Sequence, residues 1–121
     1  MKIAYKDCSA YRTIDNSEIK ELLHPDHHNG ACNQSLAEAT VAKGEKTTPH
    51  YHQQTEEIYF ILKGRGSMFL DHSSFEVSAG DSILIQPGKL HCIENTGEQA
   101  LVFLCCCSPA YQHDDTYLMN R

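Results

Sequence analysis

The feature that most constrains the fold of this chain is a series of short strand-forming runs, each closed by turn residues. Apolar and β-branched runs alternate with glycine, proline, asparagine and serine from residue 34 onward. Short strands at such regular spacing predict an all-β sandwich or barrel. We expect strands over residues 34–43, 57–62, 67–71, 75–78, 82–86, 91–95 and 100–107.

Composition limits the classes of protein to which this chain can belong. Its 121 residues suit about one domain, and 40% of them are hydrophobic, which is enough for one core. The net charge of -6 with neutral histidines disfavours nucleic acid and anionic membranes as partners. No apolar run approaches the ~20 residues of a membrane helix. The first residues lack an apolar signal core, so we expect a cytoplasmic protein.

The stretch from Gly44 to Gly64 carries the clearest candidate chemistry. His50 and His52 are two residues apart, so in an extended strand both imidazoles point to the same face. Glu57 opens the next strand-forming run, and its carboxylate can approach the histidine pair from the side. Two imidazoles and a carboxylate suit a first-row divalent metal, although a pair of surface histidines on a polar loop has the same pattern.

This stretch resembles the first motif of the cupin family. The family pattern is glycine, five residues, His-x-His, three or four residues, glutamate, six residues and glycine. The matching positions here are Gly44, His50, His52, Glu57 and Gly64.

A second stretch resembles the second cupin motif, which ends in histidine, three residues and asparagine. Gly80, Gly88, His91 and Asn95 have the family spacing. Gln86 replaces a proline of the motif, at a turn position that is not a ligand. Two matched motifs in the right order identify the chain as resembling a small single-domain cupin.

The resemblance implies a double-stranded β-helix, or jelly-roll barrel, in which the two motifs lie side by side at one mouth. We expect one domain over residues 1–121, with a barrel core at about 34–108 between an N-terminal segment, 1–33, and a tail, 109–121. Apolar residues in 17–23 fit helical spacing, but this segment is extended in many cupins, and we expect a strand there.

The resemblance also implies His50, His52, Glu57 and His91 as ligands of one divalent transition metal. Iron, manganese, nickel, copper and zinc all accept three imidazoles and a carboxylate, so the metal's identity stays open. Four protein ligands leave one or two coordination positions free for a substrate, water or dioxygen.

The residues beyond Glu57 alternate between the two faces of the predicted strand. Tyr59 points inward with Glu57, where its phenol is either an acid or hydrogen-bond donor at the site or a packed barrel residue. Ile58, Phe60 and Leu62 point outward, and large apolar residues on an outer face indicate that something covers it. The cover is another chain or the terminal segments. Small cupins are commonly homodimers, and we expect a homodimer.

Two further segments carry polar residues without a fixed role. The tail after Pro109 resembles the C-terminal segment of small sugar-processing cupins, where an aspartate near the metal acts as a general base. Asp114 and Asp115 are the candidates, and a solvated surface tail is the alternative. The loop 24–30 holds three histidines that are either ligands or solvated side chains.

The six cysteines do not indicate disulfides, because the cytosol keeps thiols reduced. Cys105, Cys106 and Cys107 are adjacent in a strand, so they cannot converge on one ion, and we expect small buried residues. Cys92 follows His91 and therefore points away from the metal.

Three functions agree with this pattern. The first is a metal-dependent enzyme of the isomerase or lyase type that acts on a small sugar-like or oxo-acid substrate. The second is a metal-dependent dioxygenase. The third is a non-catalytic cupin that binds a small molecule, which the intact ligand set disfavours.

Overall fold

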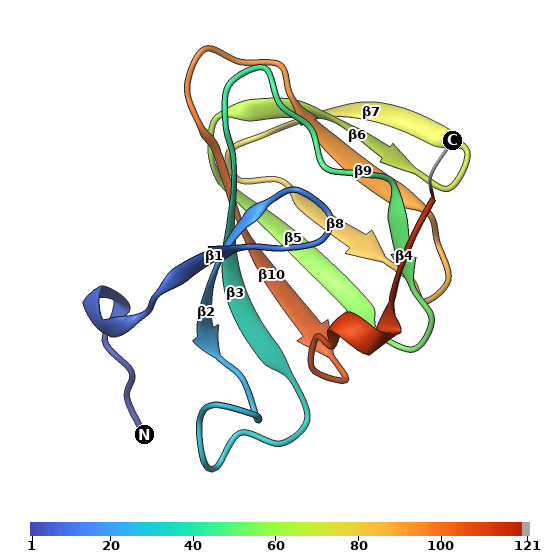
Figure 1. Cartoon of the computed structure of the whole chain (residues 1–121). Helices are drawn as coiled ribbons and strands as arrows, with labels where there is room; N and C mark the ends of the chain where they lie inside the picture. The colour runs from blue at the N-terminus through green and yellow to red at the C-terminus, as the bar shows by residue number, and fades with distance from the viewer. Residues whose placement is uncertain (120–121) are drawn as a thin grey trace.

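In the computed structural model, which describes residues 1–119, two antiparallel sheets enclose the core (Figure 1). Over these residues one sheet has six strands in the order β1-β2-β3-β10-β5-β8, and the other has five in the order β11-β4-β9-β6-β7. The strands of the first sheet are β1 (Ala10–Arg12), β2 (Glu18–Leu23), β3 (Ser35–Val41), β10 (Leu101–Ser108), β5 (Glu56–Lys63) and β8 (Ser82–Ile85). The strands of the second are β11 (Thr116–Leu118), β4 (His50–His52), β9 (His91–Asn95), β6 (Arg65–Leu70) and β7 (Ser73–Ser78). Two 3-10 turns, η1 (Tyr5–Asp7) and η2 (His113–Asp115), lie near the ends.

The predicted all-β jelly roll is confirmed, and so is the alternation that defines its faces. Along β5 the side chains of Tyr59 and Ile61 are buried, whereas those of Ile58, Phe60 and Leu62 are exposed. Because successive strand residues face opposite sides, one face of β5 lines the core and the other lies on the surface. The segment 17–23 is extended, as expected, and its strand is β2.

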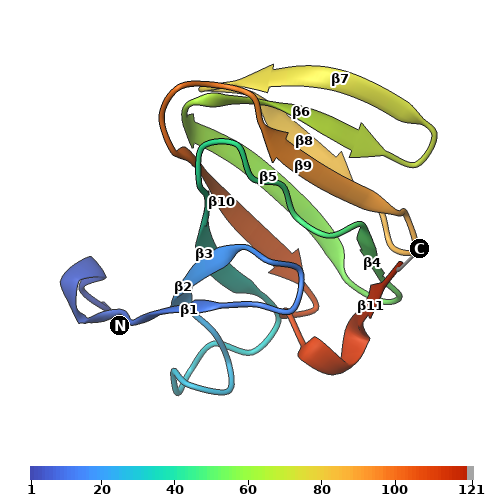
Figure 2. The same ribbon diagram turned by 45° about the horizontal axis from the view of Figure 1, so that its top comes forward.

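The core lies between the two sheets and draws large apolar side chains from both. Ile61 and Phe103 come from the first sheet, and Met68 and Ile93 come from the second. In Figure 2, β1 and β2 run across the lower part of the barrel, far from β6 and β7 at the top. The apolar core therefore spans both sheets, and Ile19 of β2 packs against it from the N-terminal strands.

The C-terminal tail returns to the barrel and forms β11, which pairs with β4 (Figure 1). Its register places Thr116 opposite His52 and Leu118 opposite His50. The sequence pattern does not predict this strand, because three residues are too few to show a period. The alternative of a solvated surface tail is wrong for these residues.

All six cysteines lie within the described residues, and all are free, as expected. Cys105 and Cys107 are buried on the inward face of β10, as expected. The expectation of a buried residue is wrong for Cys106, which is half-buried because strand alternation turns it to the opposite face. Among residues 1–119 there is no helix that is both long and apolar enough to cross a membrane.

Candidate metal centre

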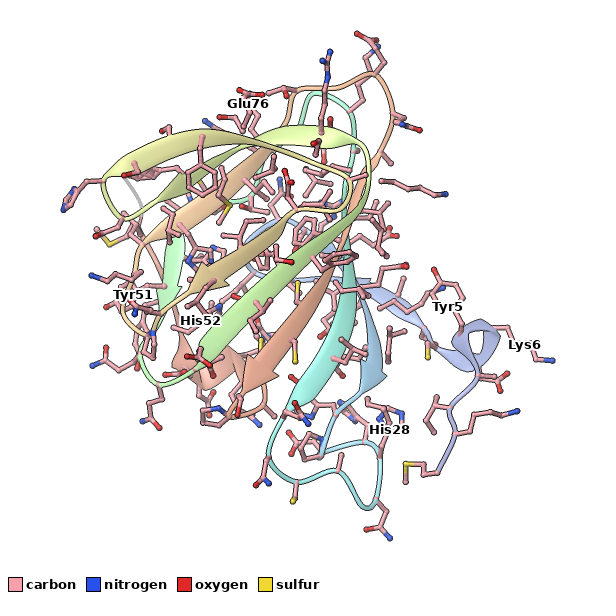
Figure 3. All side chains as sticks on the ribbon, turned by 180° about the vertical axis from the view of Figure 1, so that it is seen from behind. Tyr5, Lys6, His28, Tyr51, His52 and Glu76 are labelled. Atoms are coloured by element: carbon pink, nitrogen blue, oxygen red, sulfur yellow. The ribbon has the colours of Figure 1, made fainter. Side chains whose placement is uncertain are left out.

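Two neighbouring strands bring three histidines together inside the barrel. His50 and His52 point inward from β4, and His91 stands opposite His50 in the register with β9. All three are buried, and each offers a ring nitrogen within 4.8 Å of the other two. Tyr51, between the two histidines of β4, faces outward and stacks on Tyr117 (Figure 3 labels Tyr51 and His52). His50 and His52 therefore share the inner face of the strand, as their spacing predicted.

The main chain fixes the orientation of two of these imidazoles. Nδ1 of His50 lies 2.7 Å from the carbonyl oxygen of Thr48, and Nδ1 of His91 lies 2.9 Å from that of Lys89. A carbonyl oxygen only accepts hydrogen bonds, so each Nδ1 carries the ring proton. In the neutral imidazole, Nε2 then presents its lone pair to the centre of the site, as metal ligation requires.

His52 is oriented by a side chain of the C-terminal strand. Its Nδ1 lies 3.1 Å from the hydroxyl oxygen of Thr116, and that hydroxyl donates to the carbonyl oxygen of Gln112 at 3.0 Å. Because the hydroxyl has only one proton to donate, it accepts from His52 Nδ1–H. His52 therefore also presents a lone pair at Nε2. The role of Thr116 could not be found from the sequence, since no local pattern places the tail beside β4.

Glu57 completes the group from the start of β5. Its Oε1 lies 3.3 Å from Nε2 of His52 and 3.6 Å from Nε2 of His91. Among the described residues, Oε1 of Glu57 and Nε2 of His91 are buried without a hydrogen-bond partner. Buried polar atoms are nearly always paired, and a divalent cation would satisfy both of these atoms at once. The residues present therefore fit a metal ion.

The electrostatics of the group also favour a bound cation. Burial lowers the pKa of His50 to about 4, with a further contribution from repulsion by His91. Burial acts to raise the pKa of Glu57, but the neighbouring imidazoles of His52 and His91 outweigh it and hold that pKa below its usual value. Burial similarly lowers the pKa of His52, yet Glu57 outweighs it and leaves that pKa raised. The site thus holds an ionised carboxylate at neutral pH.

A narrow cavity extends from His50, His52 and Glu57 toward the N-terminal strands. The centres of water molecules can occupy a volume of about 40 Å³ inside it. At about 10–15 Å³ for one water, that is room for about three. Its walls combine apolar groups and hydroxyls with the carboxylates of Asp15, Glu21 and Glu57, and none of its described lining residues is Lys or Arg. The cavity therefore suits a small ligand without strong negative charge.

Tyr59 lines this cavity, as the alternation along its strand predicted. Its side chain is buried against neighbouring rings. Its ring lies 4.5 Å from that of Phe103 and 6.1 Å from that of His91, measured between centroids. Burial holds the pKa of Tyr59 well above the ordinary tyrosine value, with Glu57 adding to the effect. The phenol therefore stays neutral near neutral pH, and its packing against Phe103 favours the interpretation as a packed barrel residue.

Asp114 and Asp115 lie in η2, and neither lines the cavity. Asp114 is exposed. The carboxylate of Asp115 accepts hydrogen bonds at 3.1–3.2 Å from the backbone N–H groups of residues 53, 54 and 55. These residues form the turn between His52 and Glu57. Asp115 thus holds the spacing of two candidate ligands, and this placement does not support a general-base role for either aspartate.

Replacing Asp115 with alanine should weaken metal binding without removing a ligand. We expect a loss of affinity of about 10–100-fold, the effect that outer groups of metal sites commonly have. Competition with a metallochromic chelator measures the change, and Asp114→Ala is the matched control, because that side chain is exposed. Equal affinities for the two variants would show that the turn does not need Asp115.

The histidine-rich loop has a structural role at one of its members. His24 is buried, its Nε2 lies 2.6 Å from the carbonyl oxygen of Tyr111, and its Nδ1 accepts from the backbone N–H of Asp26 at 3.0 Å. Both ring nitrogens are therefore in use. Glu21, His24 and His27 lie close enough together to be compared with a metal site. However, His27 is 63% exposed, and neither ring nitrogen of His24 is free to bind an ion.

Three residues that line the cavity were not foreseen from the sequence. Cys107 donates from Sγ to Oε2 of Glu57 at 3.4 Å, and Cys105 lies two residues before it on the same face. Alternation along residues 103, 105 and 107 was an available signal for both cysteines. Asp15 places Oδ2 at 3.3 Å from Nε2 of His50. No local pattern marks Asp15, because its segment has no period.

The comparison with protein families now decides the assignment. The family model described as the cupin domain matches residues 37–107, a segment that contains all three histidines and Glu57. The chain is a cupin.

Two curated relatives align with much of this cupin. An uncharacterized protein of Methanocaldococcus jannaschii is 50% identical over 120 residues, which cover 99% of this cupin and 95% of that protein. A protein of Thermotoga maritima named as oxalate-binding is 35% identical over 88 residues, which cover 72% of this cupin and 71% of that protein.

Solved structures agree on the fold. The crystal structure of a predicted oxalate decarboxylase from Thermotoga maritima has a TM-score of 0.78 and 25% identity, and covers 90% of this cupin and 99% of that chain. The polyketide cyclase RemF from Streptomyces resistomycificus has a TM-score of 0.82. At 20% identity, covering 100% of this cupin and 86% of that chain, it shows the fold alone.

Proposed function

We propose that this cupin is a metal-dependent enzyme of the isomerase or lyase type, acting on a small sugar-like or oxo-acid substrate. The observation that carries the proposal is the convergence of three buried Nε2 atoms with the Glu57 carboxylate, beside a narrow cavity that His50, His52 and Glu57 line. A divalent metal bound there supplies Lewis acidity toward a carbonyl or hydroxyl oxygen of the substrate.

The lining of the cavity narrows the class of substrate. A phosphate or a second carboxylate is commonly met by Arg or Lys, and the described lining residues include neither. Burial raises the pKa of Tyr11, at the rim, to about 12, so its hydroxyl remains neutral. The surroundings favour an uncharged or singly charged compound with a hydroxyl next to a carbonyl, and they disfavour phosphorylated sugars.

Non-catalytic binding of a small carboxylate is the second candidate, and the relative named as oxalate-binding favours it. Against it stands the acidic character of the cavity, which Asp15, Glu21 and Glu57 all line. A dianion would approach three carboxylates there and find no cationic side chain among the described lining residues.

The proposed activity can be tested without knowing the product. Metal-loaded protein is incubated in deuterated water with small hydroxy-aldehydes, hydroxy-ketones and 2-oxo acids, and exchange of the hydrogen next to the carbonyl is followed by proton NMR. We expect exchange or turnover of at least one compound, and none with His91→Ala. Tight binding of oxalate with no exchange of any compound would favour the binding protein instead.

We also propose a homodimer formed through the outer face of the first sheet. Ile58, Phe60, Leu62 and Leu84 are 39–51% exposed, and the pairing of Ile58 with Leu84 makes them one continuous patch across β5 and β8. Apolar patches of this kind mark interaction surfaces.

A charge at the centre of this patch should separate the protomers. Phe60→Glu is expected to shift the sedimentation coefficient to that of a monomer of 13.6 kDa. Phe75→Glu is the matched control, because Phe75 has similar exposure but lies on β7 of the other sheet. An unchanged sedimentation profile for Phe60→Glu would contradict the proposed interface.

A further inference from the structure

We propose that Asp15 is a fifth protein ligand of the metal, delivered by the hairpin between β1 and β2. The inference rests on the proposed metal centre and extends it to a residue outside both cupin motifs. Asp15 approaches the histidines from the side of His50, whereas Glu57 approaches from the side of His52 and His91.

The distance between Asp15 and His50 agrees with a shared ion. Two atoms each about 2.1 Å from one metal lie about 3.0 Å apart at a right angle and about 3.4 Å apart at the tetrahedral angle. Oδ2 of Asp15 lies 3.3 Å from Nε2 of His50, and Oε1 of Glu57 lies 3.3 Å from Nε2 of His52. The second carboxylate is thus as close to its histidine as the carboxylate of the motif is.

The hairpin directs one oxygen of Asp15 at the site and holds the other. Oδ1 accepts from the hydroxyl of Thr13, and from the hydroxyl and the backbone N–H of Ser17 at 2.7 Å and 3.1 Å. Thr13 and Ser17 are both buried, so this arrangement is fixed inside the protein. With Oδ1 fully engaged, Oδ2 is the oxygen left for the centre, and the side chain is only 17% exposed.

The same backbone segment positions Asp15 and His50. The N–H of Thr48 donates to the carbonyl oxygen of Asp15 at 2.7 Å, and the carbonyl oxygen of Thr48 accepts from Nδ1 of His50 at 2.7 Å. A movement of this segment therefore shifts both groups together. Outer contacts of this kind orient the ligands of metal sites.

A cation between Asp15 and His50 resolves an otherwise unfavourable contact. Because Nδ1 of His50 holds the ring proton, Nε2 of the neutral ring presents a lone pair, and Oδ2 of Asp15 presents another. Two acceptors that face each other repel, whereas a metal ion attracts both. With Asp15 and Glu57 bound, two carboxylates balance the charge of a divalent ion, and one position of an octahedral ion stays open. An uncharged substrate suits that site.

Cobalt binding to the metal-stripped protein tests the assignment directly. Co²⁺ is titrated into the wild type and Asp15→Asn, with chelator competition for affinity and visible absorption for coordination geometry. Asn keeps an oxygen for Thr13 and Ser17 but loses the charge. We expect the affinity to fall by about 10–100-fold and the absorption bands to change in position and intensity. We also expect Asp15→Glu to restore part of the affinity.

Glu18→Gln is the matched control, because Glu18 is an exposed carboxylate on the same hairpin. Hydrogen exchange gives a second readout, in which metal should slow exchange of the Thr48 amide in the wild type but not in Asp15→Asn. Unchanged cobalt affinity and spectrum in a folded Asp15→Asn protein, while His91→Ala binds no metal, would overturn the role of Asp15 and leave the metal centre intact. No cobalt binding by the wild type would overturn the metal centre itself.

Discussion

Replacing His91 with alanine is expected to remove bound metal from the protein. His91 is fully buried, its Nδ1 is held by the carbonyl of Lys89, and Nε2 faces Glu57 at 3.6 Å. Loss of outer groups alone costs about 10–100-fold in metal affinity, so loss of a ligand should cost about 100-fold or more. Elemental analysis of untagged protein, together with chelator competition, measures the occupancy. Full occupancy in His91→Ala would contradict its assignment as a ligand.

Cys92→Ala is the matched control for this substitution. Cys92 is the next residue on β9 and points to the opposite face, so its loss should leave metal occupancy unchanged.

Metal removal should also lower the stability of the wild type, because an ion that binds only the folded chain contributes about 2.7 kcal/mol when its concentration is 100 times its dissociation constant. His91→Ala should show no difference in melting temperature with and without chelator.

Truncation of Phe103 is expected to have the largest effect on folding. Phe103 is 1% exposed, packs on Tyr59 and lines the cavity. Removing a buried phenyl ring loses its transfer free energy and leaves a void, which together cost about 3–5 kcal/mol. The free energy of unfolding of Phe103→Ala, from urea denaturation of metal-stripped protein, should fall by that amount.

Phe75→Ala provides the comparison for Phe103→Ala, since the same atoms are removed from an exposed position. We expect a change of under about 1 kcal/mol there, as for most surface substitutions. A loss of stability at position 103 no larger than at position 75 would show that the packing behind the site contributes little to the fold.

Local sequence patterns, together with the resemblance to the two cupin motifs, predicted the barrel and four candidate ligands. Alternation within a strand correctly placed Glu57, Tyr59 and Ile61 inside and Phe60 outside, because the side-chain period of a strand is two residues. Motif spacing brought His91 to the same site as His50, and the register between β4 and β9 confirms their proximity.

The groups that complete the site depend on contacts between distant parts of the chain. Thr116 reaches His52 across 64 residues, and Asp15 approaches His50 from a hairpin whose sequence has no period. Asp114 and Asp115 were the general-base candidates in the tail, but the carboxylate of Asp115 binds backbone N–H groups rather than facing the cavity. Such tertiary contacts leave no periodic signal, so alternation and motif spacing could not predict them.

Anomalous diffraction from crystals of the metal-loaded protein tests the central claim most directly. Data collected on both sides of the absorption edge of the bound metal locate the ion independently of any assumed ligand. We predict one peak per chain, within bonding distance of Nε2 of His50, His52 and His91 and of the Glu57 carboxylate. A peak elsewhere, or no peak at this position in crystals soaked with a divalent metal, would contradict the account.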